Sequence, residues 1–522
     1  MLEIILLLSL ALLIRLLPVF MWSRDPSDAW AHVYYADNIK ANGGRIPKFV
    51  NRIKPDTEFS YPWGIAWLLA KFKIKNPIRL GIIFNVIISI IEILVTMGFI
   101  IWFLGISGSN SDSQTALLLG IGFYFALPQV VSTWSGLYGL NARPLGTILV
   151  NVSVVTLVAG IYVNYWLLCV PILLLPIILL FSKFGIQAIL LSFLILSVLT
   201  VSITPIIVFL VALLFSYVML RKHLFVLLKG HYMHSKFYAQ FLQFKHSATT
   251  KRCWTLIGWI KFAVSTRSLN LLVLRAYWTP ILRSLLLNPW LLCIVWLAIN
   301  YYSNFNEMEQ VLFQVVVFAY VLTVIINIKF LRFLGEADRY LSFFATMSMA
   351  ILISMHTVAM GDYIVYGLCL VISIGNTLAL VVAQSKHKVD KETKSEIQLG
   401  GYLNDKVSSL DNIITIPTNL TQRLLPFINA SFVGMYMNAP ISEKRQGILK
   451  TLYPKNYPYP TTDFDFLKNE FDVKYLVFAK QYCTEAYLER QFLEKDLVKV
   501  PQEPVLFENQ KYIVYKLSNS VC

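Results

Sequence analysis

Apolar runs long enough to cross a membrane constrain this chain more than any other feature. A bilayer core of about 30 Å needs about 20 apolar residues in a helix, because lipid offers backbone N–H and C=O groups no other partner. The sequence supplies that pattern repeatedly and predicts about eleven spans. The candidate spans are 2–22, 79–104, 114–135, 143–163, 165–182, 185–203, 204–220, 286–303, 310–329, 340–357 and 362–384.

The first apolar run has the features of a retained helix. Residues 2–22 lack a basic n-region and a small-residue cleavage site, and they are long enough to span. A signal peptide would have both features. We therefore expect an uncleaved first helix.

Composition agrees with a membrane protein. Of the 522 residues 57% are hydrophobic and 14% are charged, whereas soluble proteins carry about 25% charged residues. That balance excludes a soluble multidomain enzyme, a disordered chain and a secreted disulfide scaffold. The net charge is +16, but no soluble basic domain displays it as a nucleic-acid binder would. Membrane lipids and phosphate groups are the expected partners, and nucleic acid is not.

Three segments outside the apolar runs set the predicted domains. Loop 23–78 follows the first helix, segment 221–285 is basic, and residues 385–522 turn soluble in composition. We predict a polytopic α-helical membrane domain over 1–384, followed by a soluble α/β domain over 385–522.

The basic segment leaves two questions open. Segment 221–285 holds eleven Lys and Arg residues and no Asp or Glu. The positive-inside rule places it in the cytoplasm, whereas eleven uniform crossings place it on the same side as loop 23–78. Its amphipathic pattern fits helices in the headgroup layer, either as an anchor to anionic lipid or as part of a substrate site.

Alternating apolar residues predict strands in the C-terminal region. The expected strands are Ile413–Pro417, Ser431–Tyr436, Lys474–Ala479, Val505–Phe507 and Tyr512–Tyr515, the last two forming a hairpin. Helices are expected over Leu420–Asn429 and Thr484–Glu494. No glycine-rich phosphate loop opens either helix, so nucleotide binding has no support.

Candidate catalytic groups lie just after the first apolar run. Asp25 followed by Pro26 predicts a helix start, because Asp accepts a capping hydrogen bond and proline has no N–H to leave unpaired. A helix from there places Asp28, His32 and Tyr35 on one face. A carboxylate at the bilayer surface beside an imidazole can take a proton from an attacking hydroxyl, or hold a cation beside a phosphate.

Structural roles for the same residues compete with that reading. Asp25 suits a plain N-cap, and Asp28 in a first helical turn is favoured by the helix dipole. His32 also suits a local hydrogen bond. Both readings stay open on the residues alone.

Downstream motifs carry a family resemblance. Asn42-Gly43-Gly44-Arg45-Ile46-Pro47 predicts a helix stop with an extended exit, and Tyr61-Pro62-Trp63-Gly64 precedes the next apolar run. This order resembles the first extracytoplasmic loop of the GT-C superfamily, membrane glycosyltransferases that use polyprenyl-phosphate sugars and include oligosaccharyltransferase catalytic subunits. The resemblance implies an active-centre carboxylate, which Asp28 matches best and Asp25 second, with His32 and Tyr61 beside the substrate.

Two later stretches resemble the same superfamily. Gly335-Glu336-Ala337-Asp338-Arg339-Tyr340 is similar to a G-E-x-x-R-Y motif, and Tyr277-Trp278-Thr279-Pro280 to an aromatic-Trp-x-Pro element. The resemblance implies that Glu336 and Arg339 bind substrate, with Arg339 suited to a lipid-linked phosphate because a guanidinium donates two parallel hydrogen bonds. A structural Glu336–Arg339 pair at a helix start is the alternative. The WWDYG motif of oligosaccharyltransferases is absent from 385–522, which disfavours transfer to peptide.

These inferences predict an inverting, multi-pass glycosyltransferase of the cell membrane, with its active-site loop outside the cytoplasm. The donor is a sugar on a polyprenyl phosphate, and the acceptor is a lipid-linked glycan, a polysaccharide or, less favoured, a protein. A divalent cation such as Mg or Mn is compatible with the carboxylates. The rivals are a lipid-linked oligosaccharide flippase or other transporter, a glycan polymerase with a diphosphate-linked donor, and a silent scaffold of the same shape.

Overall fold

The computed structural model divides into two compact units. The helical unit comprises Met1–Arg24, Ile78–Leu224 and Lys251–Val389, and the sheet unit comprises Asp25–Pro77, Phe225–Thr250 and Asp390–Cys522. The structure describes residues 6, 9, 12, 13, 27–72, 77–107, 120, 122, 140–242, 256–266, 272, 276, 279–328, 331–335, 337–356, 360–385, 394–434, 439–454, 457, 459–480 and 504–517. The predicted domain boundary between 384 and 385 stays a prediction.

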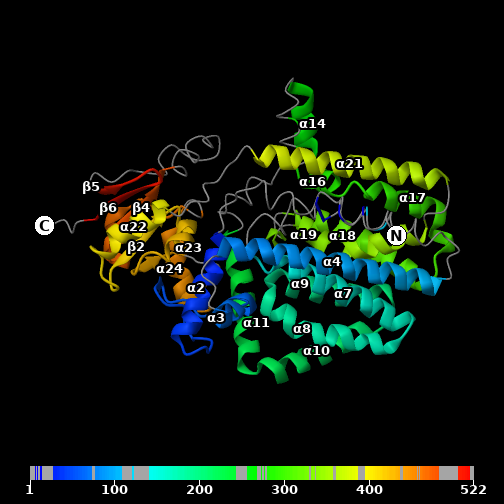
Figure 1. Cartoon of the computed structure of the whole chain (residues 1–522), viewed down its shortest axis with the longest axis horizontal. Helices are drawn as coiled ribbons and strands as arrows, with labels where there is room; N and C mark the ends of the chain where they lie inside the picture. The colour runs from blue at the N-terminus through cyan, green and yellow to red at the C-terminus, as the bar shows by residue number, and fades with distance from the viewer. Residues whose placement is uncertain are drawn as a thin grey trace. The chain divides into compact units, whose positions relative to one another are not determined.

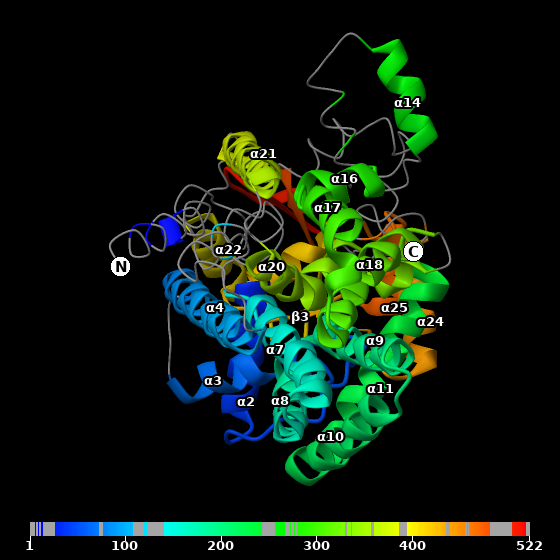
Figure 2. The ribbon, with the colours of Figure 1, turned by 90° about the vertical axis from the view of Figure 1, so that its right-hand side faces the viewer.

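α-Helices, most of them apolar, form most of the helical unit. They are α4 (Pro77–Ser107), α7 (Arg143–Tyr162), α8 (Cys169–Phe181), α9 (Lys183–Leu199), α10 (Thr204–Leu220), α14 (Leu256–Ser265), α16 (Pro280–Leu287), α17 (Leu291–Tyr301), α18 (Glu307–Ile326), α19 (Asp338–Tyr340), α20 (Thr346–Met355) and α21 (Met360–Ser385). Shorter 3-10 segments are η1 (Tyr165–Leu168), η3 (Tyr302–Asn304) and η4 (Arg332–Leu334), and η5 (Leu341–Ala345) is a π-helix. Helices α7 to α10 pack side by side (Figure 2). The predicted, mostly helical architecture is confirmed.

Local sequence explains where several of these helices begin. Proline occupies the first turn of α7, α10 and α16, where its missing N–H costs nothing. Helix α18 starts with a capping box, in which the Glu309 N–H donates to Asn306 Oδ1 and the Asn306 N–H donates to Glu309 Oε2. Ser182 caps α9 by accepting from the Gly185 N–H at 3.0 Å.

The number of membrane crossings is smaller among the described helices than the sequence predicts. Three helices, Ile83–Ile106, Arg143–Tyr162 and Glu307–Ile326, are long and apolar enough to span, and five spans result if two bent helix pairs count as one each. Apolar helices also occupy the predicted spans 165–182, 185–203 and 340–357, but they are shorter or broken. Helix α21 covers the predicted span 362–384 along its whole length. Spans 2–22 and 114–135 lie almost wholly outside the described residues. The predicted count of eleven is therefore not confirmed.

A six-stranded sheet organises the sheet unit (Figure 1). The strand order is β1 (Ile53–Lys54), β3 (Ser431–Val433), β2 (Asn412–Ile416), β4 (Val473–Ala479), β6 (Tyr512–Lys516) and β5 (Val505–Glu508). The first four strands run parallel, and β6 and β5 form the predicted antiparallel hairpin. Because β1 comes from loop 23–78, this loop and the C-terminal segment share one sheet.

Helices cover both faces of the sheet. Apolar residues of α2 (Ser27–Ala41) and α22 (Lys394–Asn404) share a core with one face. Residues of α24 (Glu443–Leu452), α25 (Phe464–Phe471) and the π-helix η2 (Tyr238–Leu242) share a core with the other. Ile413 and Ile414 illustrate the alternation, because they belong to opposite cores. The remaining helices are α3 (Gly64–Phe72), α11 (Lys222–Phe237), η6 (Thr418–Leu420) and α23 (Thr421–Leu424).

The strands predicted for the C-terminal region are present, whereas one predicted helix is shorter than expected. Every expected strand is present, with the second shortened to Ser431–Val433. The helix expected over Leu420–Asn429 is wrong in length, because α23 ends at Leu424 and the chain turns before β3. The helix expected over Thr484–Glu494 lies outside the described residues.

A buried ion pair joins three elements of this unit. Glu396 on α22 is fully buried, and its Oε1 lies 2.6 Å from Arg423 Nε and accepts from the Tyr512 hydroxyl at 2.7 Å. Lys511 Nζ lies 3.5 Å from the same oxygen. The carboxylate therefore links α22, α23 and the C-terminal hairpin.

Candidate functional site

Helix α2 carries the predicted catalytic segment and ends where the sequence predicts. The last helical residue is Ala41, and Gly43 and Gly44 follow with φ values of 65° and 79°. Those left-handed conformations suit glycine, which has no Cβ to clash. The helix stop predicted at these glycines is therefore present.

An aromatic cluster forms on the face of α2 that holds His32. His32 is 2% exposed, and its ring centroid lies 6.1 Å from that of Tyr61. Tyr35, one turn later, stacks on Tyr61 at 5.9 Å and meets Phe59 edge-on at 4.7 Å. Burial, with smaller contributions from neighbouring tyrosines, holds the pKa of Tyr35 well above its ordinary value. The cluster brings the predicted residues His32 and Tyr61 together around a neutral phenol.

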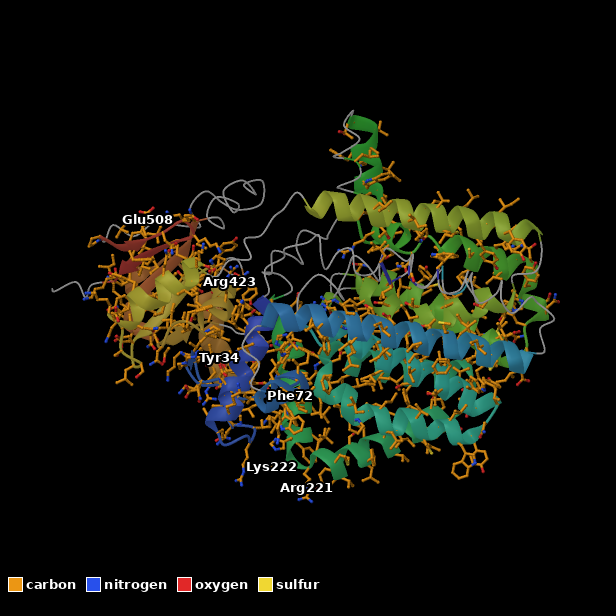
Figure 3. The ribbon with its side chains drawn as sticks, in the orientation of Figure 1. Tyr34, Phe72, Arg221, Lys222, Arg423 and Glu508 are labelled. Atoms are coloured by element: carbon orange, nitrogen blue, oxygen red, sulfur yellow. The ribbon has the colours of Figure 1, made fainter. Side chains whose placement is uncertain are left out.

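Arg52 fixes the opposite side of α2. Its guanidinium donates to the Ile428 carbonyl at 2.7 Å and to the Leu425 carbonyl at 3.0 Å. The same group lies 5.3 Å from the ring centroid of Tyr34 on α2 (Figure 3), whose hydroxyl donates to the Asn51 carbonyl. The guanidinium thus ties α2 to the segment between α23 and β3.

Of the three acidic residues predicted for the site, only Asp28 lies among the described residues. Asp28 lies in the first turn of α2, four residues before His32. Asp25 and Glu336 lie outside the described residues. The catalytic assignment of Asp28 and Asp25, and the substrate-binding assignment of Glu336, stay predictions.

The segment around Arg339 packs against the first turn of α9. Arg339 is 7% exposed, and its guanidinium carbon lies 4.2 Å from the centroid of the Phe184 ring. Gly335 has a φ of 106°, and a Cβ there would come within 2.6 Å of the same ring. The Tyr340 hydroxyl lies 3.1 Å from Gln187 Oε1. Gly335, Arg339 and Tyr340 of the motif that resembles G-E-x-x-R-Y thus all contact α9, and the Arg339 guanidinium is buried there.

Two basic residues that open helices, Lys183 and Arg143, are not among the site residues that the sequence predicts. Lys183 begins α9, next to Phe184. Arg143 begins α7, and its N–H donates to Asn141 Oδ1 at 2.9 Å. Lys183 interrupts an apolar stretch, and an ionisable residue in such a stretch signals function by default.

A divalent cation such as Mg or Mn is one expectation of the sequence. No three His, Cys, Asp or Glu side chains come together in the described part of the chain. A cation of the Mg or Mn class takes about six oxygen ligands in octahedral geometry. The divalent cation stays a prediction.

Comparison with known proteins identifies the fold through solved structures. No protein-family model matches the chain, and no curated protein matches it in sequence. An Archaeoglobus fulgidus oligosaccharyltransferase solved with zinc and sulfate matches 94% of this chain and 70% of its own, with 12% identity and a TM-score of 0.57. ArnT from Cupriavidus metallidurans, bound to undecaprenyl phosphate, matches 98% of this chain and 97% of its own, with 10% identity and a TM-score of 0.54. The chain has a GT-C fold.

A second archaeal structure supports the same fold. The oligosaccharyltransferase AglB from Archaeoglobus fulgidus, in complex with an inhibitory peptide and a dolichol-phosphate, matches at 13% identity over 94% of this chain and 71% of its own, with a TM-score of 0.56. The GT-C resemblance noted on short motifs thus holds for nearly the whole chain. Identities this low establish the fold, and the chemistry has to be argued from the residues.

Proposed function

We propose that this chain is an integral membrane glycosyltransferase that transfers a sugar from a polyprenyl phosphate to a lipid-linked glycan or a polysaccharide. The observation that carries the proposal is the match over 98% of this chain to ArnT, whose structure holds undecaprenyl phosphate. The protein resides in the cell membrane, with loop 23–78 outside the cytoplasm. Transfer to protein is disfavoured because residues 385–522 lack a WWDYG motif.

The proposed reaction is a single displacement at the anomeric carbon. Asp28 takes the proton of the acceptor hydroxyl, or orients that hydroxyl, as its oxygen bonds to the anomeric carbon. The bond between that carbon and the phosphate oxygen breaks, and the electron pair leaves with the lipid phosphate. One displacement inverts the anomeric configuration.

The other proposed residues bind the reactants. His32 and Tyr61 lie together beside Tyr35. Tyr61 is partly exposed and offers its ring to a sugar, and the buried His32 reaches the sugar only if binding uncovers its imidazole. Arg339 stabilises the phosphate as negative charge develops on the leaving oxygen, an interaction that strengthens in a water-poor environment. Its burial and its contact with Phe184 fix the guanidinium before substrate binds.

Asp28→Asn tests the catalytic proposal. The purified variant should bind a polyprenyl-phosphate sugar but transfer it at least about 100-fold more slowly, the scale of general-base catalysis. Asp37→Asn on the same helix is the matched control, because Asp37 is exposed and pairs only with Lys40 at 3.4 Å among described residues. Wild-type transfer by Asp28→Asn would overturn the assignment, and loss in Asp25→Asn alone would move the role to Asp25.

A buried polar stripe on α4 favours transport as a second candidate. Asn85, Ser89, Glu92 and Thr96 recur at helical spacing, and each is at most 7% exposed. Transporters place buried ionisable residues within their spans. In reconstituted vesicles, flipping of a lipid-linked oligosaccharide that Glu92→Gln abolishes and Asp28→Asn spares would favour transport over transfer.

A further inference from the structure

Helix α11 exposes a row of basic and aromatic side chains along one face. Phe225, Lys229 and Tyr232 recur at the spacing of one helix face, and Lys222 lies one turn before Phe225. Both lysines are exposed, and Phe225 and Tyr232 are 61% and 63% exposed. We call these four side chains the outer face of α11.

The other side of α11 packs inside the sheet unit. Met233 is buried, and Phe237 belongs to a core that includes residues of β3 and β4. A Cβ added at Gly230 would lie 2.3 Å from Ser60 Cβ, so the glycine lets α11 touch loop 23–78. This packing fixes the rotation of the helix about its axis, and the outer face therefore stays turned away from the core.

Helix α10 leads to the start of α11 through an uncharged stretch. It runs for 17 residues without an acidic or basic side chain, and at 1.5 Å a residue it is about 26 Å long, close to the thickness of a hydrocarbon core. Its Leu210, Leu214 and Val218 are each more than half exposed, which suits lipid better than water. Arg221 and Lys222 follow directly, and Figure 3 shows both side chains pointing away from the ribbon. This change from apolar to basic side chains matches the boundary between hydrocarbon and headgroups.

The charge of the outer face suits an anionic surface. Helix α11 contains no Asp or Glu, and among the described residues neither Lys222 nor Lys229 has an ion-pair partner. Lys236, one turn after Tyr232, pairs instead with Glu443 at 2.6 Å. A lysine lays its aliphatic stem along apolar surface and keeps its ammonium among headgroups, and tyrosine is enriched at the same depth. Lysines interleaved with aromatic rings on one helix face are therefore suited to a layer of anionic lipid headgroups.

We propose that the outer face of α11 binds anionic lipid headgroups in the leaflet on the side of loop 23–78. Lys222 and Lys229 contact the headgroup charges, and Phe225 and Tyr232 lie at the level of the upper acyl chains. The contact of α11 with loop 23–78 selects this leaflet, although the positive-inside rule alone would place a basic helix in the cytoplasm. That the leaflet faces away from the cytoplasm rests on the proposed function.

Photo-cross-linking in nanodiscs tests the outer face locally. The full-length protein, with p-benzoylphenylalanine in place of the exposed Phe225, would be reconstituted in mixed phosphatidylcholine and phosphatidylglycerol, and its cross-linked lipids identified by mass spectrometry. Phosphatidylglycerol should be enriched over its bulk share, and Lys222→Gln and Lys229→Gln should each lower that enrichment about fivefold, the scale of one basic side chain at an anionic surface. Lys236→Gln is the matched control on the same helix and should leave the enrichment unchanged, because Lys236 already pairs with Glu443.

The alternative occupants give different results. Cross-links to protein instead of lipid, no enrichment of phosphatidylglycerol, or equal enrichment in all three lysine variants would overturn the proposal. Displacement of the cross-linked lipid by a soluble oligogalacturonate would also overturn it, in favour of a substrate site on α11. Loss of transfer in Asp28→Asn with the lipid preference intact would support the outer face independently of the catalytic proposal.

Discussion

Replacing Arg52 by methionine should loosen the attachment of α2 to the segment between α23 and β3. Methionine keeps most of the aliphatic stem and removes both hydrogen bonds to the Ile428 and Leu425 carbonyls. Arg52 has a φ of 55°, but the left-handed conformation costs both side chains about the same, so this cost cancels. The difference therefore reports the lost guanidinium contacts.

The magnitude follows from the two bonds. A hydrogen bond to a charged group contributes about 1.5–3 kcal/mol, and Leu425 and Ile428 are both buried, so their carbonyls lose their partner. Because Arg52 is itself only half-buried, we take the lower end and expect a loss of about 3 kcal/mol. That loss corresponds to a roughly 100-fold larger population of the opened state.

Amide hydrogen exchange on the full-length protein measures this opening. Peptides covering 425–434 and α2 should exchange roughly 100-fold faster in Arg52→Met, provided that opening is local. Arg45→Met is the matched control, because Arg45 is an exposed arginine of the same loop. Equal protection in Arg52→Met and Arg45→Met would refute the role of Arg52.

Three further predictions concern separate parts of the chain. Glu396→Gln should lower the stability of the β5–β6 hairpin by about 3 kcal/mol, because Arg423 and Lys511 would then face a buried neutral amide. Amide hydrogen exchange in β6 should become faster, and unchanged exchange would contradict this. Gly146→Ala should lower the melting temperature by forcing α7 from Ser182, whereas Gly98→Ala, with nothing within 4 Å, should not; equal melting temperatures would count against the packing argument. Burial alone would raise the pKa of Asp411, but hydrogen bonds from Lys474 and Ser408 outweigh that effect and lower the pKa. The carboxylate therefore stabilises its turn above about pH 4, and the stabilisation is lost as the pH falls further. The protection factors of amides 408–411, which correct for the pH dependence of intrinsic exchange, should therefore fall on acidification in the wild type but not in Asp411→Asn.

Hydrophobic patterns in the sequence predicted the helices and strands that are long enough to repeat such a pattern. The apolar runs predicted most described helices of the helical unit, and alternation predicted β2, β4 and the hairpin. Strand β1 could not be predicted in this way, because a strand of two residues is too short to show an alternating pattern. Its pairing with β3 depends on a contact between segments almost 380 residues apart. The π-helix η5 likewise has no pattern distinct from an apolar α-helix.

The candidate site was predictable only where residues lie on one helix. Spacing placed His32 and Tyr35 on a common face, and both rings contact Tyr61. The packing of Gly335 and Arg339 on Phe184 depends instead on a contact between α9 and a segment about 150 residues later, which no spacing within one segment encodes.

The anomeric configuration of the product tests the central claim most directly. The purified chain would be incubated with a polyprenyl-phosphate sugar of known anomeric configuration and a glycan acceptor, and the product read by proton NMR. A single displacement predicts free lipid phosphate and a glycoside of the opposite configuration. A product that keeps the donor's configuration, or a donor that stays intact with every acceptor offered, would contradict the account.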